Sequence, residues 1–171
     1  MDLKRIRPAV KQDLDQAAEI TQQAARREFA QYGSLQEINS WCSAVRGNHR
    51  KRLDDSNSLM VVAELKKGIV ATGYATKIGN KAYVGGIYSI QQGRGIGREI
   101  LINLLLWAKQ DPRLNSLEAD VFEGSKSWAF LTGLGLAETS RELDPAGFFK
   151  DARIIRMQGE LLVASDLLQA S

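Results

Sequence analysis

The sequence predicts a single α+β domain in which helices flank a mixed, mostly antiparallel sheet. Its 171 residues are the size of one ordinary domain. Its composition, 44% hydrophobic and 25% charged, is that of a globular chain with a substantial core. Helix-like and strand-like segments follow one another without internal repeats or a linker-like change in composition. We expect one domain over residues 1–162 and a short, loosely held C-terminal tail over residues 163–171.

The N-terminal third predicts a short strand and two helices. Residues 4–7 are extended and stop at Pro8, and Asp13 is placed to cap a first helix that ends near Gly33. Apolar and small residues recur in this helix at helical spacing: Leu14, Ala17, Thr21, Ala24 and Ala25. Ser34 and Glu37 match a capping box, which predicts a second helix that Gly47 ends.

The middle and C-terminal parts predict a meander, a helical crossover and a closing pair of strands. Two turn signals, Lys67-Gly68 and Gly79-Asn80, separate three β-rich runs at residues 59–65, 69–78 and 82–90. A helix should follow at 96–109, then a strand at 117–122, a helix at 124–134 and two strands at 137–143 and 153–161. Because a helix joins the third meander strand to the strand at 117–122, these two strands should be parallel.

Residue counts exclude several classes of protein. Cys42 is the only cysteine, so an intramolecular disulfide and cysteine-built zinc sites are excluded, and a reducing cytoplasm is the expected location. On the apolar stripe of the second helix we interpret Cys42, like Trp41, as a core residue, and we assign Trp107 to the core as well. His49 is the only histidine and lies among basic residues, which disfavours a histidine-dependent triad. The most hydrophobic run, residues 100–108, is interrupted by Asn103 and is too short to cross a membrane.

The formal charge of +3 is too small to indicate nucleic acid by itself. Four cations fall within the seven residues 46–52 and leave a basic nucleic-acid-binding module as one alternative. No aromatic residues are interleaved with them, and a solvated helix end explains them equally well. We therefore expect neither a nucleic-acid nor a membrane partner.

A glycine-rich turn between the third meander strand and the helix at 96–109 is the most informative segment. It contains Gln92-Gly93-Arg94-Gly95-Ile96-Gly97. Glycines at alternate positions let the backbone turn tightly, and the first amides of the next helix have no internal acceptor and lie at its positive end. This arrangement is suited to a pyrophosphate. A Rossmann fingerprint would need glycine at Arg98, and a P-loop would need a lysine there followed by serine or threonine, so both alternatives fail.

The segment Gln92–Gly97 resembles the (Gln/Arg)-x-x-Gly-x-(Gly/Ala) motif of the GNAT superfamily of N-acetyltransferases, and the element order over residues 4–160 is also similar. The resemblance implies a GNAT-like sheet with one parallel strand pair splayed at the cofactor site, and acetyl-CoA as cosubstrate without a metal. It also implies that the turn binds the pyrophosphate and that the preceding strand end pairs with the pantetheine arm. The implied cofactor-binding residues are Ile87, Ser89, Gln92, Gly93, Arg94, Gly95, Ile96, Gly97, Arg98 and Phe130.

The sequence departs from the family pattern in two places. The Val-x-Pro that usually precedes the loop lacks its proline: without a gap Ile87 matches the valine and Ser89 the proline, whereas a two-residue deletion would match Ser89 to the valine. In the helix after the parallel strand, Leu131 stands where a tyrosine often protonates the leaving thiolate, and Gly124 replaces an asparagine. The usual general acid is therefore not carried over.

The catalytic base must come from another position. Carboxylates near the end of the parallel strand are the candidates, namely Asp120 and Glu123 with Glu118 as a third, and Tyr88 is a candidate on the last meander strand. The resemblance implies transfer of an acetyl group to a primary amine of a small molecule or peptide, by direct attack in a ternary complex. A non-catalytic acyl-CoA-binding sensor of the same fold is the alternative, and a homodimer stays open.

Overall fold

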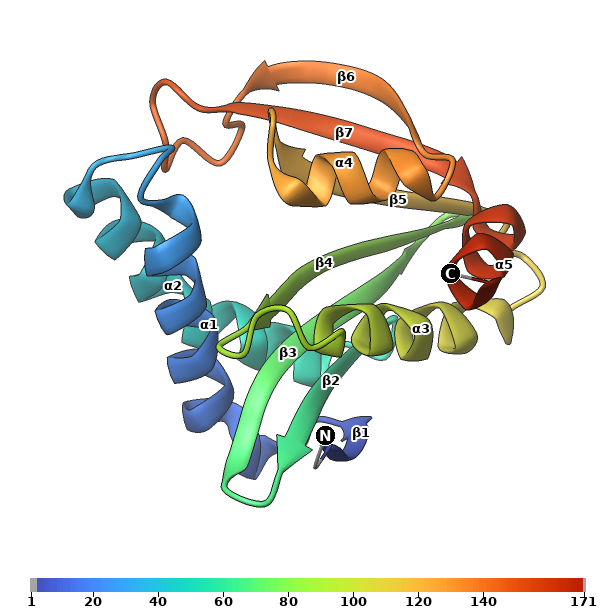
Figure 1. The fold of residues 1–171 in the computed structure, drawn as a ribbon, viewed down its shortest axis with the longest axis horizontal. Coiled ribbons are helices and arrows are strands. Elements are labelled where there is room, and N and C mark those ends of the chain that lie inside the picture. The colour runs from blue at the N-terminus through green and yellow to red at the C-terminus, as the bar shows by residue number, and fades with distance from the viewer. Residues whose placement is uncertain (1–2, 171) are drawn as a thin grey trace.

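The computed structural model describes residues 3–170 and contains one seven-stranded sheet in the order β1-β2-β3-β4-β5-β7-β6 (Figure 1). Only β4 and β5 pair in parallel, and every other neighbouring pair is antiparallel. The strands are β1 (Leu3–Pro8), β2 (Ser58–Leu65), β3 (Gly68–Ile78), β4 (Lys81–Ser89), β5 (Ser116–Phe122), β6 (Ala137–Leu143) and β7 (Arg153–Glu160). The predicted mixed, mostly antiparallel sheet is confirmed.

Helices cover both faces of this sheet. They are a short 3-10 turn η1 (Lys11–Asp13), α1 (Leu14–Phe29), α2 (Leu35–Asp54), α3 (Ile96–Lys109), α4 (Lys126–Gly133) and α5 (Leu161–Ala170). Strand β2 shows the two layers by its alternation: Met60 and Val62 pack with Ala17 and Ile20 of α1, whereas the intervening residues pack in the larger core with α3. The larger core also contains buried residues of α4 and α5, so these two helices share the α3 face.

Helix α2 does not end at Gly47, as the sequence suggested, but continues to Asp54. A glycine costs a helix interior only about 1 kcal/mol relative to alanine. Val45 and His49, one turn apart on either side of Gly47, are both buried, and their packing holds the helix together. The basic residues at 46–52 therefore lie on a packed helix, where the Arg52 guanidinium stacks on the Tyr74 ring at 3.6 Å.

The expectation of a loosely held tail after residue 162 is wrong. Residues 161–170 form α5, in which Leu161, Ala164 and Leu168 are almost fully buried. Their spacing of three and four residues is that of a helix with one apolar face. The side chain of Arg98 in α3 also donates a hydrogen bond to the Leu168 carbonyl.

Asp13 does not cap α1 through its side chain. Its carboxylate instead accepts the Val10 amide at 2.9 Å and both terminal nitrogens of Arg7, at 2.6 and 2.9 Å. The charge-assisted bonds to Arg7 lower the pKa of Asp13. They join β1 to the start of the first helix. The capping box of α2 is present as predicted, with Ser34 accepting the Glu37 amide.

Cys42 is 2% exposed and lies in a smaller, aromatic-rich core, which confirms its interpretation as a core residue. Trp41 is partly buried in the same core, and Trp107 packs on the edge of the larger one. Among the described residues, no helix is long and apolar enough to cross a membrane.

Candidate functional site

Strands β4 and β5 pair at their first residues and then separate. Parallel pairing covers Lys81 to Tyr83 of β4 against Ser116 to Glu118 of β5 and extends no further in the described chain. Residues 84–89 of β4 continue along β3, while residues 119–122 of β5 continue along β7. We call these two segments the splayed strand ends (Figure 1). Among the described residues, backbone groups on the β5 side of β4 therefore have no neighbouring strand from residue 84 onward.

A bulge in β4 accompanies this separation. In the pairing with β3, Tyr74 lies opposite Gly85 and Thr72 opposite Tyr88, so β4 carries one extra residue at this point. Gly86 has a φ of +59°, and a Cβ added there would lie 2.6 Å from a ring carbon of Tyr74. Both the left-handed backbone and the ring contact require glycine. The bulge is thus held in place by Tyr74.

The glycine-rich turn exposes a row of backbone amides at the start of α3. Gly93 and Gly95 have φ values of +73° and +72°, and Gly95 caps α3 without any side-chain hydrogen bond. Within residues 3–170, the amides of residues 93–97 have no hydrogen-bond acceptor. A Cβ built on Gly93 or Gly95 would meet no atom within 4 Å, so open space adjoins the turn. Unpaired amides at the positive end of a helix fit a diphosphate.

Side-chain hydrogen bonds fix the residues that lead into the glycine-rich turn. The guanidinium of Arg27 in α1 donates to the Ser89 carbonyl at 2.9 Å, and the Gln92 amide oxygen, when turned toward Arg27, accepts from it at 3.1 Å. The Ser89 hydroxyl accepts the Gln91 amide at 3.1 Å. Arg94 is exposed beside the amides. Arg98 does not add mobile charge to the mouth of the turn, as the sequence suggested, because its side chain is bound to α5.

The hydrophobic residues of the predicted cofactor site are placed as follows. Ile96 is buried beneath the turn, and Ile87 packs on the larger core close to Gly97. Phe130 of α4 is 42% exposed, whereas its neighbour Leu131 is 7% exposed and belongs to the larger core. Leu131, which the resemblance aligns with the tyrosine of the family pattern, therefore faces the core.

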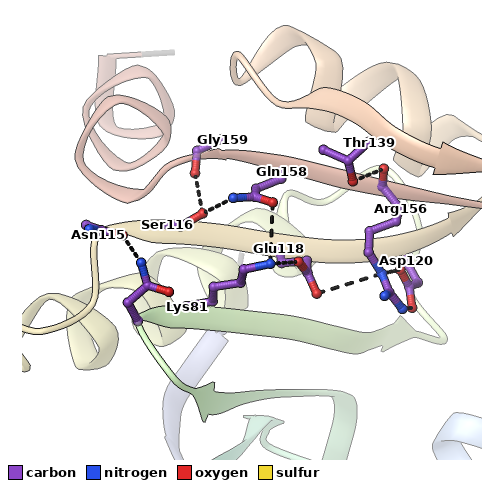
Figure 2. A network of polar contacts seen from close by, with 10 residues as sticks. Lys81, Asn115, Ser116, Glu118, Asp120, Thr139, Arg156, Gln158 and Gly159 are labelled. Atoms are coloured by element: carbon purple, nitrogen blue, oxygen red, sulfur yellow. Dashed lines mark hydrogen bonds and ion pairs between the residues drawn. The ribbon is translucent and has the colours of Figure 1, made fainter.

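Both carboxylates predicted as bases are held by arginines. Arg156 of β7 binds the two oxygens of Asp120 at 2.9 Å each (Figure 2). Tyr83 donates to the same carboxylate at 3.4 Å. Glu118 accepts from Lys81 at 2.7 Å. Glu123 is paired with Arg141 of β6. These carboxylates serve to join β4, β5, β6 and β7.

Tyr88 lies in the aromatic-rich core that fills the space between the splayed strand ends and helices α1 and α2. Its ring centroid is 6.1 Å from that of Phe29 and 5.8 Å from that of Trp41. Burial raises the pKa of the Tyr88 phenol far above its usual range. The neutral phenol cannot serve as a base at neutral pH, and the raised pKa also makes it a weaker proton donor.

Two residues of α1 that the sequence reasoning missed also belong to this region. Arg27 contacts the end of β4, and Glu28 precedes Phe29, whose ring centroid is 5.0 Å from that of Phe122 at the end of β5. No local pattern marks either residue. Their role follows from contacts between segments some 60 to 90 residues apart, which are visible only in the folded chain.

Solved structures with a similar fold include several N-acetyltransferases. PaiA N-acetyltransferase from Thermoplasma acidophilum, in complex with coenzyme A, matches with a TM-score of 0.74 and 17% identity over 89% of this chain and 96% of its own. A GCN5-related N-acetyltransferase from Rhodopseudomonas palustris matches with a TM-score of 0.71 and 20% identity. The match covers 94% of this chain and 98% of that protein. Spermidine N-acetyltransferase from Vibrio cholerae, in complex with CoA and spermine, matches with a TM-score of 0.66 and 15% identity. The match covers 94% of this chain and 96% of that protein.

The chain thus has the fold of the GNAT N-acetyltransferases, and the resemblance seen in the sequence is confirmed at the level of the fold. No family model matches the sequence, and no curated protein is similar enough in sequence to count as a match.

Proposed function

We propose that this protein is an acetyl-CoA-dependent N-acetyltransferase that acts on a primary amine of a small molecule or peptide. The observation that carries the proposal is the row of unpaired amides at residues 93–97, next to open space and at the positive end of α3. The splayed strand ends support it, since they leave backbone groups of β4 available to an extended ligand arm. Two of the structures that share the fold contain coenzyme A.

In this proposal the amides of the turn hold the diphosphate, and β4 after residue 83 pairs with the pantetheine arm. The thioester then lies between the splayed strand ends, beside the aromatic-rich core. Bound acetyl-CoA supplies the activated acyl group. Positioning the amine against the thioester accounts for much of the rate, because a well-oriented bound pair can gain several kcal/mol over reaction in solution, roughly 7–11 in the best cases.

One observation favours a second function, that of a non-catalytic acyl-CoA sensor. Arginines hold Asp120 and Glu123, and Leu131 is buried at the position of the usual general acid. A sensor would use the same amides to bind acetyl-CoA but would release no thiol. Turnover therefore separates the two functions.

Calorimetric titration with acetyl-CoA tests the site. Gly95→Glu places a side chain and a negative charge next to the amides, and we expect it to abolish binding. Gly79→Glu is the matched control, because Gly79 also has a positive φ, +60°, with no atom within 4 Å of a Cβ, but lies in the turn before β4. The control should bind like the unmodified protein. Equal affinity for all three proteins would remove the proposed site.

Thiol release in the presence of acetyl-CoA tests the activity. Primary amines and peptides with free N-termini are added one at a time, and an enzyme releases free CoA faster with at least one of them. Binding of acetyl-CoA without release in the presence of any amine would favour the sensor.

A further inference from the structure

We infer that Glu28, in the last turn of α1, takes the proton from the ammonium group of the acceptor before the amine attacks the acetyl thioester. This inference rests on the proposed function and names the base that the reaction needs. It also names the acceptor class, an amine that is protonated at neutral pH.

Helix α1 ends against both splayed strand ends. Arg27, one residue before Glu28, donates to the Ser89 carbonyl at the end of β4. Phe29, one residue after it, lies with its ring centroid 5.0 Å from that of Phe122 in β5 and 6.1 Å from that of Tyr88 in β4. Glu28 is therefore carried by the last turn of α1, which contacts the final residues of both splayed strand ends.

The Glu28 carboxylate lies near enough to residues of the aromatic-rich core to act on them electrostatically. Tyr32, in the turn that follows α1, stacks on Phe122 with a centroid distance of 4.4 Å. The negative charge of Glu28 adds to burial in raising the pKa values of both Tyr32 and Tyr88. Lys126, the first residue of α4, and Arg27 are the cations that act on it. The charged and titratable groups that interact with Glu28 thus come from α1, the turn after it, β4 and α4.

Glu28 differs from the carboxylates that the sequence singled out. Asp120 has both oxygens bound by Arg156, and Glu123 is paired with Arg141. Over residues 3–170, the Glu28 carboxylate has neither a hydrogen bond nor an ion pair, although its side chain is partly buried. Burial raises the pKa of Glu28 and outweighs the opposing effect of Arg27 and Lys126. An unpaired carboxylate with a raised pKa beside a ligand site has the properties of a general base.

The proton and electron balance is complete without another reactant. The ammonium group gives one proton to Glu28, and the nitrogen lone pair then forms the bond to the acetyl carbon. The bond from that carbon to sulfur breaks, and its electron pair leaves on sulfur. The amine loses a second proton, which ends on the thiolate, so the products are the acetamide and free CoA. Glu28 returns its proton to water.

The test compares pH profiles of kcat/KM for the amine that gives the highest thiol release in the activity screen. Glu28→Gln removes the base and keeps the shape of the side chain. Glu19→Gln is the matched control, because Glu19 lies on an exposed face of the same helix about 13 Å along its axis. Affinity for acetyl-CoA is measured for each protein by calorimetry.

We expect Glu28→Gln to lower kcat/KM about 100-fold or more near pH 7, with unchanged affinity for acetyl-CoA. The loss should shrink to within about threefold above the pKa of the acceptor ammonium, where the amine no longer needs a base. Glu28→Asp should recover part of the rate. A loss that is the same at every pH, or no loss at all, would overturn the role of Glu28 and leave the proposed function intact. Absence of turnover with every amine would instead remove the proposed function, and this inference with it.

Discussion

His49 should make the stability of the fold depend on pH. Its ring in α2 is 4% exposed, and Nε2 lies 3.0 Å from the Thr21 hydroxyl, which lies 3.0 Å from the Thr72 hydroxyl. Thr72 in turn donates to the Gly86 carbonyl at 3.4 Å. Because a carbonyl can only accept, each hydroxyl in this chain accepts from the group before it, and His49 carries its proton on Nε2. Nδ1 then has no partner within the described chain.

The magnitude follows from the shift in pKa. Burial, together with the charge of Arg52, lowers the pKa of His49 from 6.5 to about 4. As the pH falls below 6.5 the unfolded chain takes up a proton that the folded protein excludes, so stability decreases. The loss is complete once the pH reaches the folded pKa and amounts to about 3 kcal/mol.

Urea unfolding at several pH values between about 7.5 and 4.5 measures this loss. His49→Gln cannot titrate, so the difference between the two proteins isolates His49 from the carboxylates. We expect the unmodified protein to lose about 2 to 3 kcal/mol more than the variant over this range. Parallel pH dependences for the two proteins would refute the reasoning, since they would mean that His49 is protonated as easily in the folded state as in the unfolded one.

Three further substitutions test the packing around the site. Gly86→Ala should destabilise the fold by about 2 kcal/mol or more in urea unfolding, because the alanine Cβ would lie 2.6 Å from the Tyr74 ring on a left-handed backbone. A neutral effect would mean that Tyr74 does not fix the bulge. Leu131→Tyr should lower the free energy of unfolding by about 1 to 3 kcal/mol and leave kcat unchanged, because the side chain at this position faces the core. A rise in kcat would show that the tyrosine reaches the thiolate. Leu168→Ala should cost about 2 to 5 kcal/mol, whereas a loose tail would tolerate it.

Local patterns were sufficient to predict most elements of the fold. The capping box at Ser34, the turn signals before β3 and β4, and the apolar helix after the glycine-rich turn are each built from neighbours in sequence. Their order then predicts the parallel pairing of β4 with β5, because a helical crossover leaves little choice of topology. The exposed amides of the glycine-rich turn could also be predicted, because the strand, the glycines and the helix that form this turn are contiguous in sequence.

What the sequence did not predict depends on tertiary contacts. Gly47 is a helix breaker by propensity, yet the burial of Val45 and His49 carries α2 through it. Residues 161–170 look like a loose tail in the sequence, but in the folded protein they form a helix because Leu168 is buried in the larger core with α3. The sequence predicts a catalytic base at Asp120 or Glu123, at the end of β5, but arginines of β7 and β6 bind these two carboxylates. Glu28 could not be found from sequence, because α1 meets β4 and β5 only after folding.

The central claim concerns the backbone nitrogens at the head of α3, and an NMR titration observes them directly. Amide signals of residues 93–97 are followed while CoA is added, and again while pantetheine, which lacks the diphosphate, is added. We predict large shifts with CoA and small ones with pantetheine at these residues. Equal responses to the two compounds, or unmoved signals with CoA, would contradict the claim that these amides bind a diphosphate.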